Sequence, residues 1–196
     1  MKRALFILAL AFVVIVTAAL LIVVPMVRSG LSTHEEPSAM EAFAARMVRR
    51  WAVPSDLRDK KNPMPLTPAV IADGRAHFAD HCASCHGNDG RGVGIGKQMY
   101  PEAPDMTQAV TQSLSDGELF AIIENGVRLT GMPGFGSGTS ESAAGTWPLV
   151  HFIRHLPKLT PAELREMEKL NPRTPAEHEA MKAEEEFLNG PASHEH

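Results

Sequence analysis

Both cysteines of this 196-residue chain lie in one short stretch, HCASCHGNDG, three positions apart, and a histidine follows the second cysteine directly. A structural zinc site needs four ligands, usually from two such pairs or from a regularly spaced histidine pair, so zinc would require scattered histidines. A thioredoxin-like redox motif requires a βαβ context, and no segment shows the period-two pattern of a strand. A disulfide across two residues would close a tiny loop and constrain the chain little.

The pattern formed by Cys82, Cys85 and His86 is instead the C-x-x-C-H signature of haem c attachment. Both thiols would add to the haem vinyl groups as thioethers, and the imidazole of His86 would lie where it can ligate the iron. One helical turn brings the two sulfur atoms and the ring to the same edge and face of a porphyrin. We therefore expect one covalent haem c, around whose apolar surface a small helical domain can close.

The N-terminus carries a long apolar run, Ala4 to Val24, interrupted only by Thr17. At about 1.5 Å per residue, a helix of this length reaches roughly 32 Å, enough to cross a bilayer core. The run is long and lacks an A-x-A-like cleavage site, which favours an uncleaved signal anchor over a cleaved signal peptide. Lys2 and Arg3 precede the run and predict a cytoplasmic N-terminus with the rest of the chain outside, where free paired thiols would not persist.

Charge is distributed unevenly along the chain, whose net charge is −4. Residues 1–61 hold nine lysines and arginines against five acids, whereas residues 62–156 and residues 157–196 each hold five against nine. The basic excess therefore lies near the apolar run and the acidic excess in the body. Nucleic-acid binding requires a basic face, so this distribution disfavours it and suits a protein that stands off an anionic membrane.

Residues 40–51 predict an amphipathic helix after a short linker. A stripe of apolar side chains recurs at helical spacing, and the arginines lie elsewhere; the stripe consists of Met40, Phe43, Met47 and Trp51. Such a helix packs on its own domain or lies on a membrane surface. The stretch that follows, VPSDLRDKKNPMPLTP, holds four prolines and predicts an extended connector.

Three helix starts and two loops are predicted in the middle of the chain. Thr67 and Pro68 should open a helix that runs to about His81 and delivers Cys82 at its end. A glycine-rich loop should span 87–114. Ser115 and Glu118 form a capping box for the next helix, and residues 131–145 are expected as loop. A short apolar helix is expected over 147–156, with its proline in the first turn.

The tail repeats one helix-start signal. The tetrapeptide TPAE occurs at 160–163 and again at 174–177, each time as a capping box with proline at the first helical position. Each copy predicts a helix, and the Asn-Gly pair at 189–190 should end the second. With no strand pattern elsewhere, the sequence predicts an all-α protein.

A low-spin haem carrier needs a sixth iron ligand, and the sequence places the strongest candidate in the stretch GMPGFG. Glycines around Met132 let the backbone approach a haem, and Pro133 stiffens the turn that would present the sulfur atom. The alternative is a loop methionine with a packing role. Met106, His151 and His155 are the reserve candidates.

Together these motifs resemble the class I c-type cytochromes, specifically their bacterial, membrane-anchored monohaem members, over about residues 67–156. GRAHFADHCASCH is similar to the family's N-terminal helix, with Gly74 and Phe78 before the haem motif. TWPLVHFIRHL resembles the C-terminal helix, whose aromatic residue, here Phe152, crosses the N-terminal helix near Gly74. SDGELFAIIENGV is similar to the middle helix. The resemblance implies an all-α, cytochrome c-like fold around a covalent haem.

The same resemblance implies roles for two loops. PEAPDM resembles the segment whose proline carbonyl supports the proximal histidine, so Pro104 or Pro101 would accept a hydrogen bond from His86. GMPGFG resembles the distal loop, with Met132 as the iron ligand.

We therefore expect four regions: a signal anchor or transmembrane helix (1–28), a juxtamembrane helix and Pro-rich linker (29–66), a cytochrome c domain (67–156) and an acidic helical tail (157–196). The expected function is single-electron transfer in a respiratory chain, by an electron carrier rather than an enzyme. The haem domain would lie in the periplasm on a single-pass anchor. Its partners would be a quinol-oxidising complex and a terminal oxidase or reductase. Alternatives are a haem-bearing subunit of a membrane oxidase or reductase complex and, less favoured, a haem-based ligand sensor.

Overall fold

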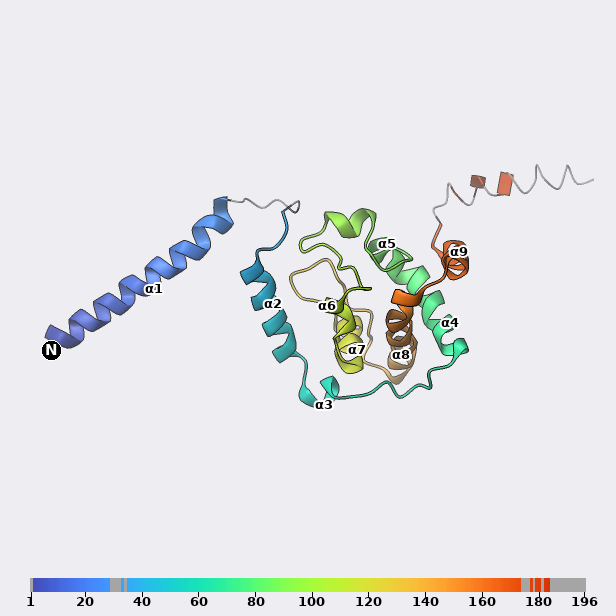
Figure 1. Ribbon diagram of the computed structural model, residues 1–196, viewed down its shortest axis with the longest axis horizontal. Coiled ribbons are helices and arrows are strands. Elements are labelled where there is room, and N and C mark those ends of the chain that lie inside the picture. Colours follow the sequence, from blue (N-terminus) through green and yellow to red (C-terminus); the bar gives the residue numbers. More distant parts are fainter. Residues whose placement is uncertain are drawn as a thin grey trace, which may run out of the picture.

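A computed structural model describes residues 2–28, 33, 35–173, 177, 179–180 and 182–183. Every regular element within these residues is a helix, as predicted (Figure 1). The α-helices are α1 (Lys2–Arg28), α2 (Ala39–Ala52), α3 (Ser55–Arg58), α4 (Pro68–His77), α5 (Ala83–His86), α6 (Ala109–Gln112), α7 (Asp116–Asn125), α8 (Ser140–His155) and α9 (Pro161–Leu170). A π-helical segment, η1 (Phe78–Cys82), joins α4 to α5, and two short 3₁₀ segments are η2 (Gly94–Gln98) and η3 (Leu156–Lys158).

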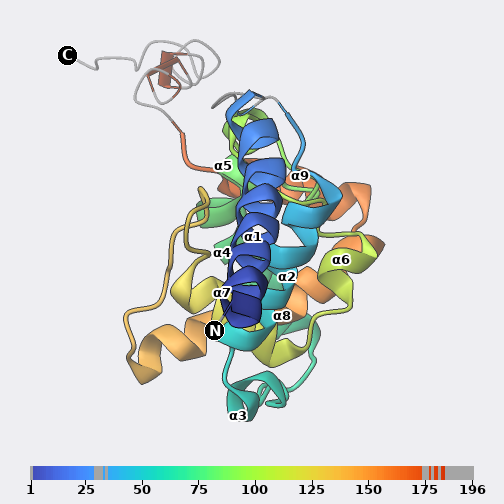
Figure 2. The same ribbon diagram turned by 90° about the vertical axis from the view of Figure 1, so that its left-hand side faces the viewer.

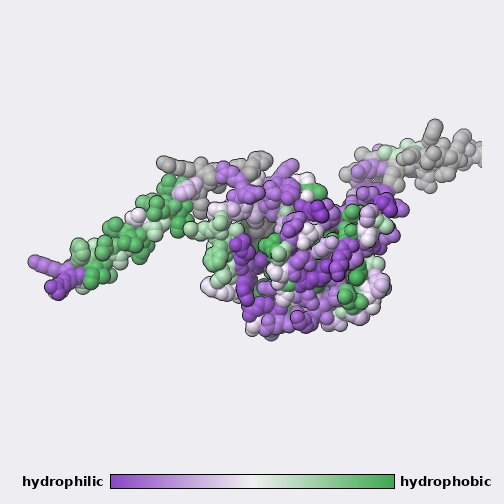
Figure 3. Space-filling model, in the orientation of Figure 1, coloured by the Kyte–Doolittle hydropathy of each residue, from purple (hydrophilic) through white to green (hydrophobic). Residues whose placement is uncertain are grey.

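The first helix contains the apolar run. Its segment Lys2–Pro25 is long and apolar enough to cross a membrane, and none of the apolar stretch is buried against the rest of the protein. This identifies a candidate membrane span by length and composition, and an N-terminal signal sequence passes the same test. Figure 3 shows the apolar surface along this helix.

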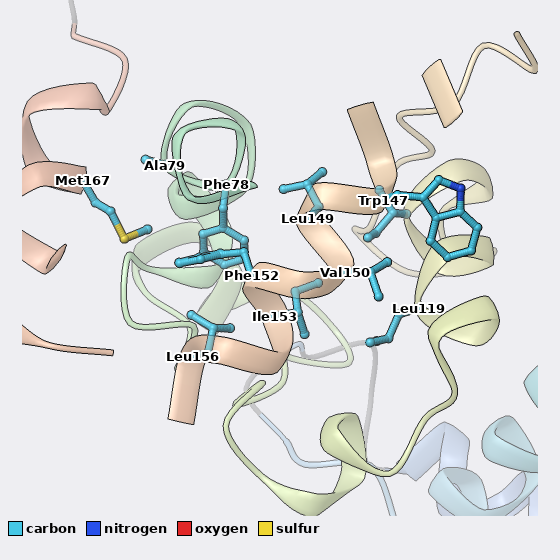
Figure 4. Close-up of a cluster of buried hydrophobic side chains, with 11 residues drawn as sticks. Phe78, Ala79, Leu119, Trp147, Leu149, Val150, Phe152, Ile153, Leu156 and Met167 are labelled. Carbon is cyan, nitrogen blue, oxygen red and sulfur yellow. The ribbon is translucent and has the colours of Figure 1, made fainter. Parts of the chain in front are cut away.

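The core of the domain forms where α8 packs against α4 and α7 (Figure 1). Phe78 and Phe152 are almost fully buried, and their ring centroids lie 5.2 Å apart at an interplanar angle of 57° (Figure 4). Helices α4 and α8 meet closely at Gly74, where a Cβ atom would lie 2.1 Å from the carbonyl oxygen of Pro148. The predicted aromatic crossing therefore needs a correction: the backbone at Pro148 meets Gly74, while Phe152 packs one turn further along, on Phe78.

The last core helix begins earlier than predicted. Helix α8 starts at Ser140 with Thr139 as its N-cap, so part of the expected loop 131–145 is helical. Pro148 consequently lies in the middle of the helix and not in its first turn. A proline there removes one backbone hydrogen bond. Burial of the sequence around it, from Thr146 to Val150, offsets that loss because the apolar contacts favour continuing the helix through the proline.

The N-terminal core helix extends beyond its predicted end. Thr67 caps α4 and Pro68 occupies its first turn, as predicted. The helical path then continues through η1 and α5 to His86, so the cysteine motif itself is helical. A π-helical segment widens one turn, and this widened turn contains the first cysteine.

The predicted connector and long loop each contain short helices, α3 in the first and η2 and α6 in the second. The capping boxes at Ser115–Glu118 and Thr160–Glu163 are both formed. Helix α9 buries Met167 completely against the core. The second TPAE helix, predicted over 174–189, lies largely outside the described residues.

Candidate functional site

The cysteine motif lies at the end of the helical run, where the chain must leave the helix. Gly87 adopts a φ of 71° there, which glycine tolerates without strain, and its N–H donates to the carbonyl of Ala83 at 2.8 Å. The following loop turns back over the motif. The N–H of Gly92 donates to the carbonyl of His86 at 2.7 Å, and that of Val93 donates to the carbonyl of Cys85 at 3.1 Å. The loop thereby satisfies carbonyl groups that the helix end leaves free.

A buried glycine brings that loop into close contact with the motif. A Cβ atom on Gly96 would lie 2.1 Å from the carbonyl oxygen of Cys85, so the two backbones touch. The carbonyl of Gly96 also accepts a hydrogen bond from the N–H of Ala103 at 2.8 Å. Residues 87–103 are therefore fixed beside the cysteines by backbone contacts, and we call them the wall segment.

The two thiols are both free and half-buried. Burial, with a smaller contribution from Cys85, raises the pKa of the Cys82 thiol to about 12. A thiol with this pKa is protonated at neutral pH, which is unfavourable for a redox nucleophile. No group of three or more His, Cys, Asp or Glu side chains suited to a metal ion occurs among the described residues. The arrangement therefore fits neither zinc nor a dithiol redox site.

The histidine of the motif is 7% exposed. Burial lowers the pKa of His86, so its imidazole is held in the neutral form that metals require. Its Nδ1 atom is buried without a hydrogen-bond partner, a condition that native structures rarely leave unused. Phe78 lies beside the ring, with centroids 6.4 Å apart. A neutral imidazole beside two free thiols fits a covalently bound haem.

Pro104 does not support His86 in this structure, because Nδ1 of the histidine accepts and donates no hydrogen bond. The segment around Pro104 is tied elsewhere: the N–H of Ala103 donates to Gly96 and that of Met106 donates to Gly90. The hydrogen bond from His86 to Pro104 or Pro101 therefore stays a prediction for the haem-bound protein.

The predicted distal loop folds tightly onto the end of α7. The carbonyl of Met132 accepts a hydrogen bond from the N–H of Val127 at 3.1 Å, and its own N–H donates to Oγ1 of Thr130 at 3.1 Å. Further along, the N–H of Phe135 donates to the carbonyl of Ile123 at 2.9 Å. Met132 is half-buried within this loop. These hydrogen bonds thus fix the path of the loop and leave the side chain of Met132 free to contact a ligand.

An aromatic stack connects this loop to the helix of the cysteine motif. The rings of Phe135 and His81 lie nearly parallel, with centroids 6.5 Å apart and an interplanar angle of 11°. His81 directly precedes Cys82 and also stacks on His77 at 6.3 Å. The stack brings the two halves of the predicted site together. Sequence analysis missed it; the four-residue spacing of His77 and His81 places them on one helix face, but no pattern identified Phe135 as their partner.

The reserve ligand candidates are engaged elsewhere. The ring nitrogen Nε2 of His151 lies 3.0 Å from the carbonyl oxygen of Met64, and that of His155 lies 2.9 Å from Oε1 of Glu163. Met106 packs against the hydrophobic core. These contacts favour Met132 among the candidates considered.

Apolar side chains remain exposed on the loops that flank the motif. They come from the wall segment and from the distal loop: Val93, Ile95, Tyr100, Leu129 and Phe135. Apolar groups that gather around a site commonly mark a ligand-binding or partner surface. A haem held between these loops would cover apolar surface that is otherwise in water.

One family model, described as cytochrome c oxidase, cbb3-type, subunit III, matches residues 69–153. A comparison with curated proteins found no match. The matched segment includes the cysteine motif, the distal loop and nearly all of the core helices. This family implies haem. The match over residues 69–153 is consistent with a class I c-type cytochrome domain.

Proposed function

We propose that this protein carries one covalent haem and transfers single electrons outside the cytoplasmic membrane. Cys82 and Cys85 would hold the haem through thioether bonds. His86 would be the proximal iron ligand and Met132 the distal one. The observation that carries the proposal is a buried, neutral imidazole directly after two half-buried free thiols.

The haem, when bound, supplies reversible one-electron oxidation and reduction. The chain would supply the two iron ligands, which limit the haem to electron transfer. With both His86 and Met132 as ligands, the iron would have no open position for a substrate, which favours an electron carrier over a catalyst. Helix contacts at Gly74 and the backbone bonds of the distal loop hold the two ligands on separate, fixed elements.

Helix α1 would anchor the protein, with its N-terminus in the cytoplasm and the haem domain in the periplasm. Its length and composition support a membrane span, and Lys2 and Arg3 support the orientation. Donor and acceptor would be respiratory complexes: a quinol-oxidising complex on one side and a terminal oxidase or reductase on the other. Docking to either partner would be weak and transient, as electron-transfer encounters commonly are.

A redox titration of the purified full chain, followed by absorption spectroscopy, tests this function. We expect one reversible one-electron transition. Replacing the distal ligand in Met132→Ala should remove the long-wavelength band that methionine gives to oxidised c-type haem and lower the reduction potential. Met106→Ala removes a core methionine and should retain the band. A band that survives Met132→Ala would exclude this residue as the ligand.

The family description favours a second candidate, a haem-bearing subunit of a membrane oxidase. Purification from native membranes in mild detergent distinguishes the two: a free carrier elutes alone, and a subunit elutes with a larger complex. Carbon monoxide that binds readily to the reduced protein at neutral pH would instead favour a ligand sensor.

A further inference from the structure

We propose that α2 is an interfacial helix that lies on the anionic membrane into which α1 inserts, with its apolar stripe among the lipid headgroups. This inference rests on the anchoring role proposed for α1. It adds a second membrane contact that would set the orientation of the haem domain.

Three of the four residues of the apolar stripe of α2 are exposed, and the fourth, Met47, is half-buried. No residue of this helix is buried, and the exposed fractions of Met40, Phe43 and Trp51 are 68%, 59% and 76%. Packing on the domain therefore covers the stripe only in part, at Met47, and leaves its other three side chains exposed. Figure 3 shows apolar surface over α2.

The contact between α3 and the start of α7 forms a corner of the domain, and this corner holds α2 in its orientation. The hydroxyl of Ser115 donates to the carbonyl of Arg58, and a Cβ atom on Gly117 would overlap the carbonyl oxygen of Leu57, so α3 is pressed onto the start of α7. From that corner, the Arg58 guanidinium donates to the carbonyl of Arg50 at 3.3 Å. Figure 2 shows α2 along the side of the domain. The helix is thus attached to the domain at its C-terminal end.

The other side of the helix contacts the domain through a polar pair. Oη of Tyr100 donates to Oε1 of Glu41 at 3.3 Å. Glu41 also completes the capping box with Ser38 at the start of α2. On an ideal helix, position 41 lies opposite the stripe around positions 43 and 47. The domain therefore contacts a polar side of α2 and leaves the apolar side outward.

The charged residues of α2 indicate that the stripe contacts an anionic membrane and not a basic protein. Arg46 and Arg50 lie beside the stripe and are exposed, whereas Arg49 lies on the opposite side of the helix; α2 holds one acidic residue, Glu41. A helix with an apolar face and adjoining basic residues binds at the surface of an anionic bilayer, where the side chains enter the headgroup layer and the cations contact lipid phosphates. A basic partner protein would be repelled by the same arginines.

Chain length places such a surface within reach. Ten residues, 29–38, separate the end of α1 from the start of α2, and an extended chain of that length spans at most about 35 Å. A membrane that contains α1 therefore lies near α2. Since α2 is fixed to α3 and α7, contact with the lipid would hold the haem domain in a defined orientation.

Spin labels in the haem-loaded full chain test this proposal. The cysteines joined to haem do not react with a thiol label, so one new cysteine takes one label, placed by Phe43→Cys on the stripe or by Ala45→Cys on the opposite face. In nanodiscs that contain phosphatidylglycerol, we expect the first label to collide mainly with oxygen, which concentrates in lipid. The second should collide mainly with a water-soluble nickel chelate.

The arginines are tested by charge removal. Arg46→Gln with Arg50→Gln should lower the ratio of lipid-bound to free α2 roughly 30-fold. Lys61→Gln with Lys169→Gln removes the same charge from exposed positions outside α2 and should leave the ratio unchanged. Nanodiscs of phosphatidylcholine alone should weaken binding as the arginine variant does.

Two results would overturn the proposal. Equal exposure of both labels to the nickel chelate would show a helix in water. A label at position 43 shielded from both reagents would show coverage by protein, either a second copy or another chain. Failure of the underlying function would look different: without covalent haem the native cysteines take extra labels, visible by mass, and without an anchor the chain is not retained in nanodiscs.

Discussion

The two sides of the candidate haem site are built in different ways. The proximal side belongs to a helical run, α4 through α5, that packs against α8 with Gly74 and Phe78 buried in the core. The distal side is a loop, fixed by backbone bonds to the end of α7, with Met132 half-buried and Leu129 93% exposed. The proposed proximal ligand, His86, is thus positioned by packing, and the proposed distal ligand, Met132, by a surface loop.

If the chain carries the proposed haem, the haem would join the two sides. The stack of His81 and Phe135 is a direct contact between them, and it lies partly in solvent. Substitutions on the proximal side should therefore lower the stability of the folded domain. Substitutions in the distal loop should change how easily an external ligand replaces Met132, while the domain stays folded.

The largest effect is expected when the haem cannot attach. Cys82→Ala with Cys85→Ala should leave the domain largely unfolded, because a small helical core without its apolar cofactor is marginally stable. Circular dichroism and limited proteolysis measure this directly. A helical, protease-resistant protein without haem would show that packing alone joins the two sides.

The helix crossing gives the next largest effect. Gly74→Ala places a methyl group against the backbone of Pro148 and should destabilise the haem-loaded protein by about 3 kcal/mol, since neither backbone can yield without moving a core helix. Gly145→Ala in the facing helix is the matched control. A Cβ atom there would meet nothing closer than 3.7 Å, and the variant should gain about 0.5–1 kcal/mol. Denaturant unfolding of both variants compares them, and equal stabilities would refute the close crossing.

A smaller effect is expected at the distal loop. Phe135→Ala removes the stack on His81 and should raise the affinity of imidazole for the oxidised protein roughly two- to tenfold, because the loop yields its methionine more easily. Optical titration with imidazole measures the change, and thermal stability should fall little. Leu129→Ala, at an exposed position of the same loop, is the control. An unfolded Phe135→Ala variant would contradict the assignment of a distal, local role.

The smallest effect concerns α9, which lies against the proximal side. Burial raises the pKa of Glu163, but hydrogen bonds from Thr160 and His155 outweigh it, and the pKa is lower than usual. A carboxyl whose pKa falls on folding stabilises the folded state above its ordinary pKa and loses that contribution as pH falls through the folded value. Stability should therefore decline in acid below about pH 4, by less than about 1 kcal/mol.

Glu163→Gln should flatten this decline in an acid titration of thermal stability. Glu168→Gln, which changes an exposed residue of the same helix, is the control and should leave the wild-type pH profile. Identical profiles for wild type and Glu163→Gln would show that the contacts of α9 do not depend on this charge.

Local signals predicted the helix starts well and the tertiary contacts less well. Capping boxes at Ser115 and Thr160 marked two helices correctly because the hydrogen bonds that form them are local in sequence. The start of α8 was wrong because the buried face around Pro148 is a tertiary contact, and such contacts override a local helix breaker. The stack of Phe135 on His81 depends on where a loop meets a helix that is distant in sequence, which periodicity does not encode.

The apolar stripe of α2 shows the same limit. Its period predicted a helix, yet the sequence alone left open whether the stripe packs on the domain. Met40, Phe43 and Trp51 of the stripe are exposed in the structure because Glu41, on the other side of the helix, is the residue that contacts Tyr100 of the domain.

The most direct test of this account is the intact mass of the polypeptide purified from its native membranes, with fragmentation of the peptide that contains Cys82, Cys85 and His86. The account predicts the added mass of one haem, located on the two cysteines. A polypeptide of unmodified mass, or a haem released by denaturation alone, would contradict covalent attachment and the electron-carrier function proposed from it.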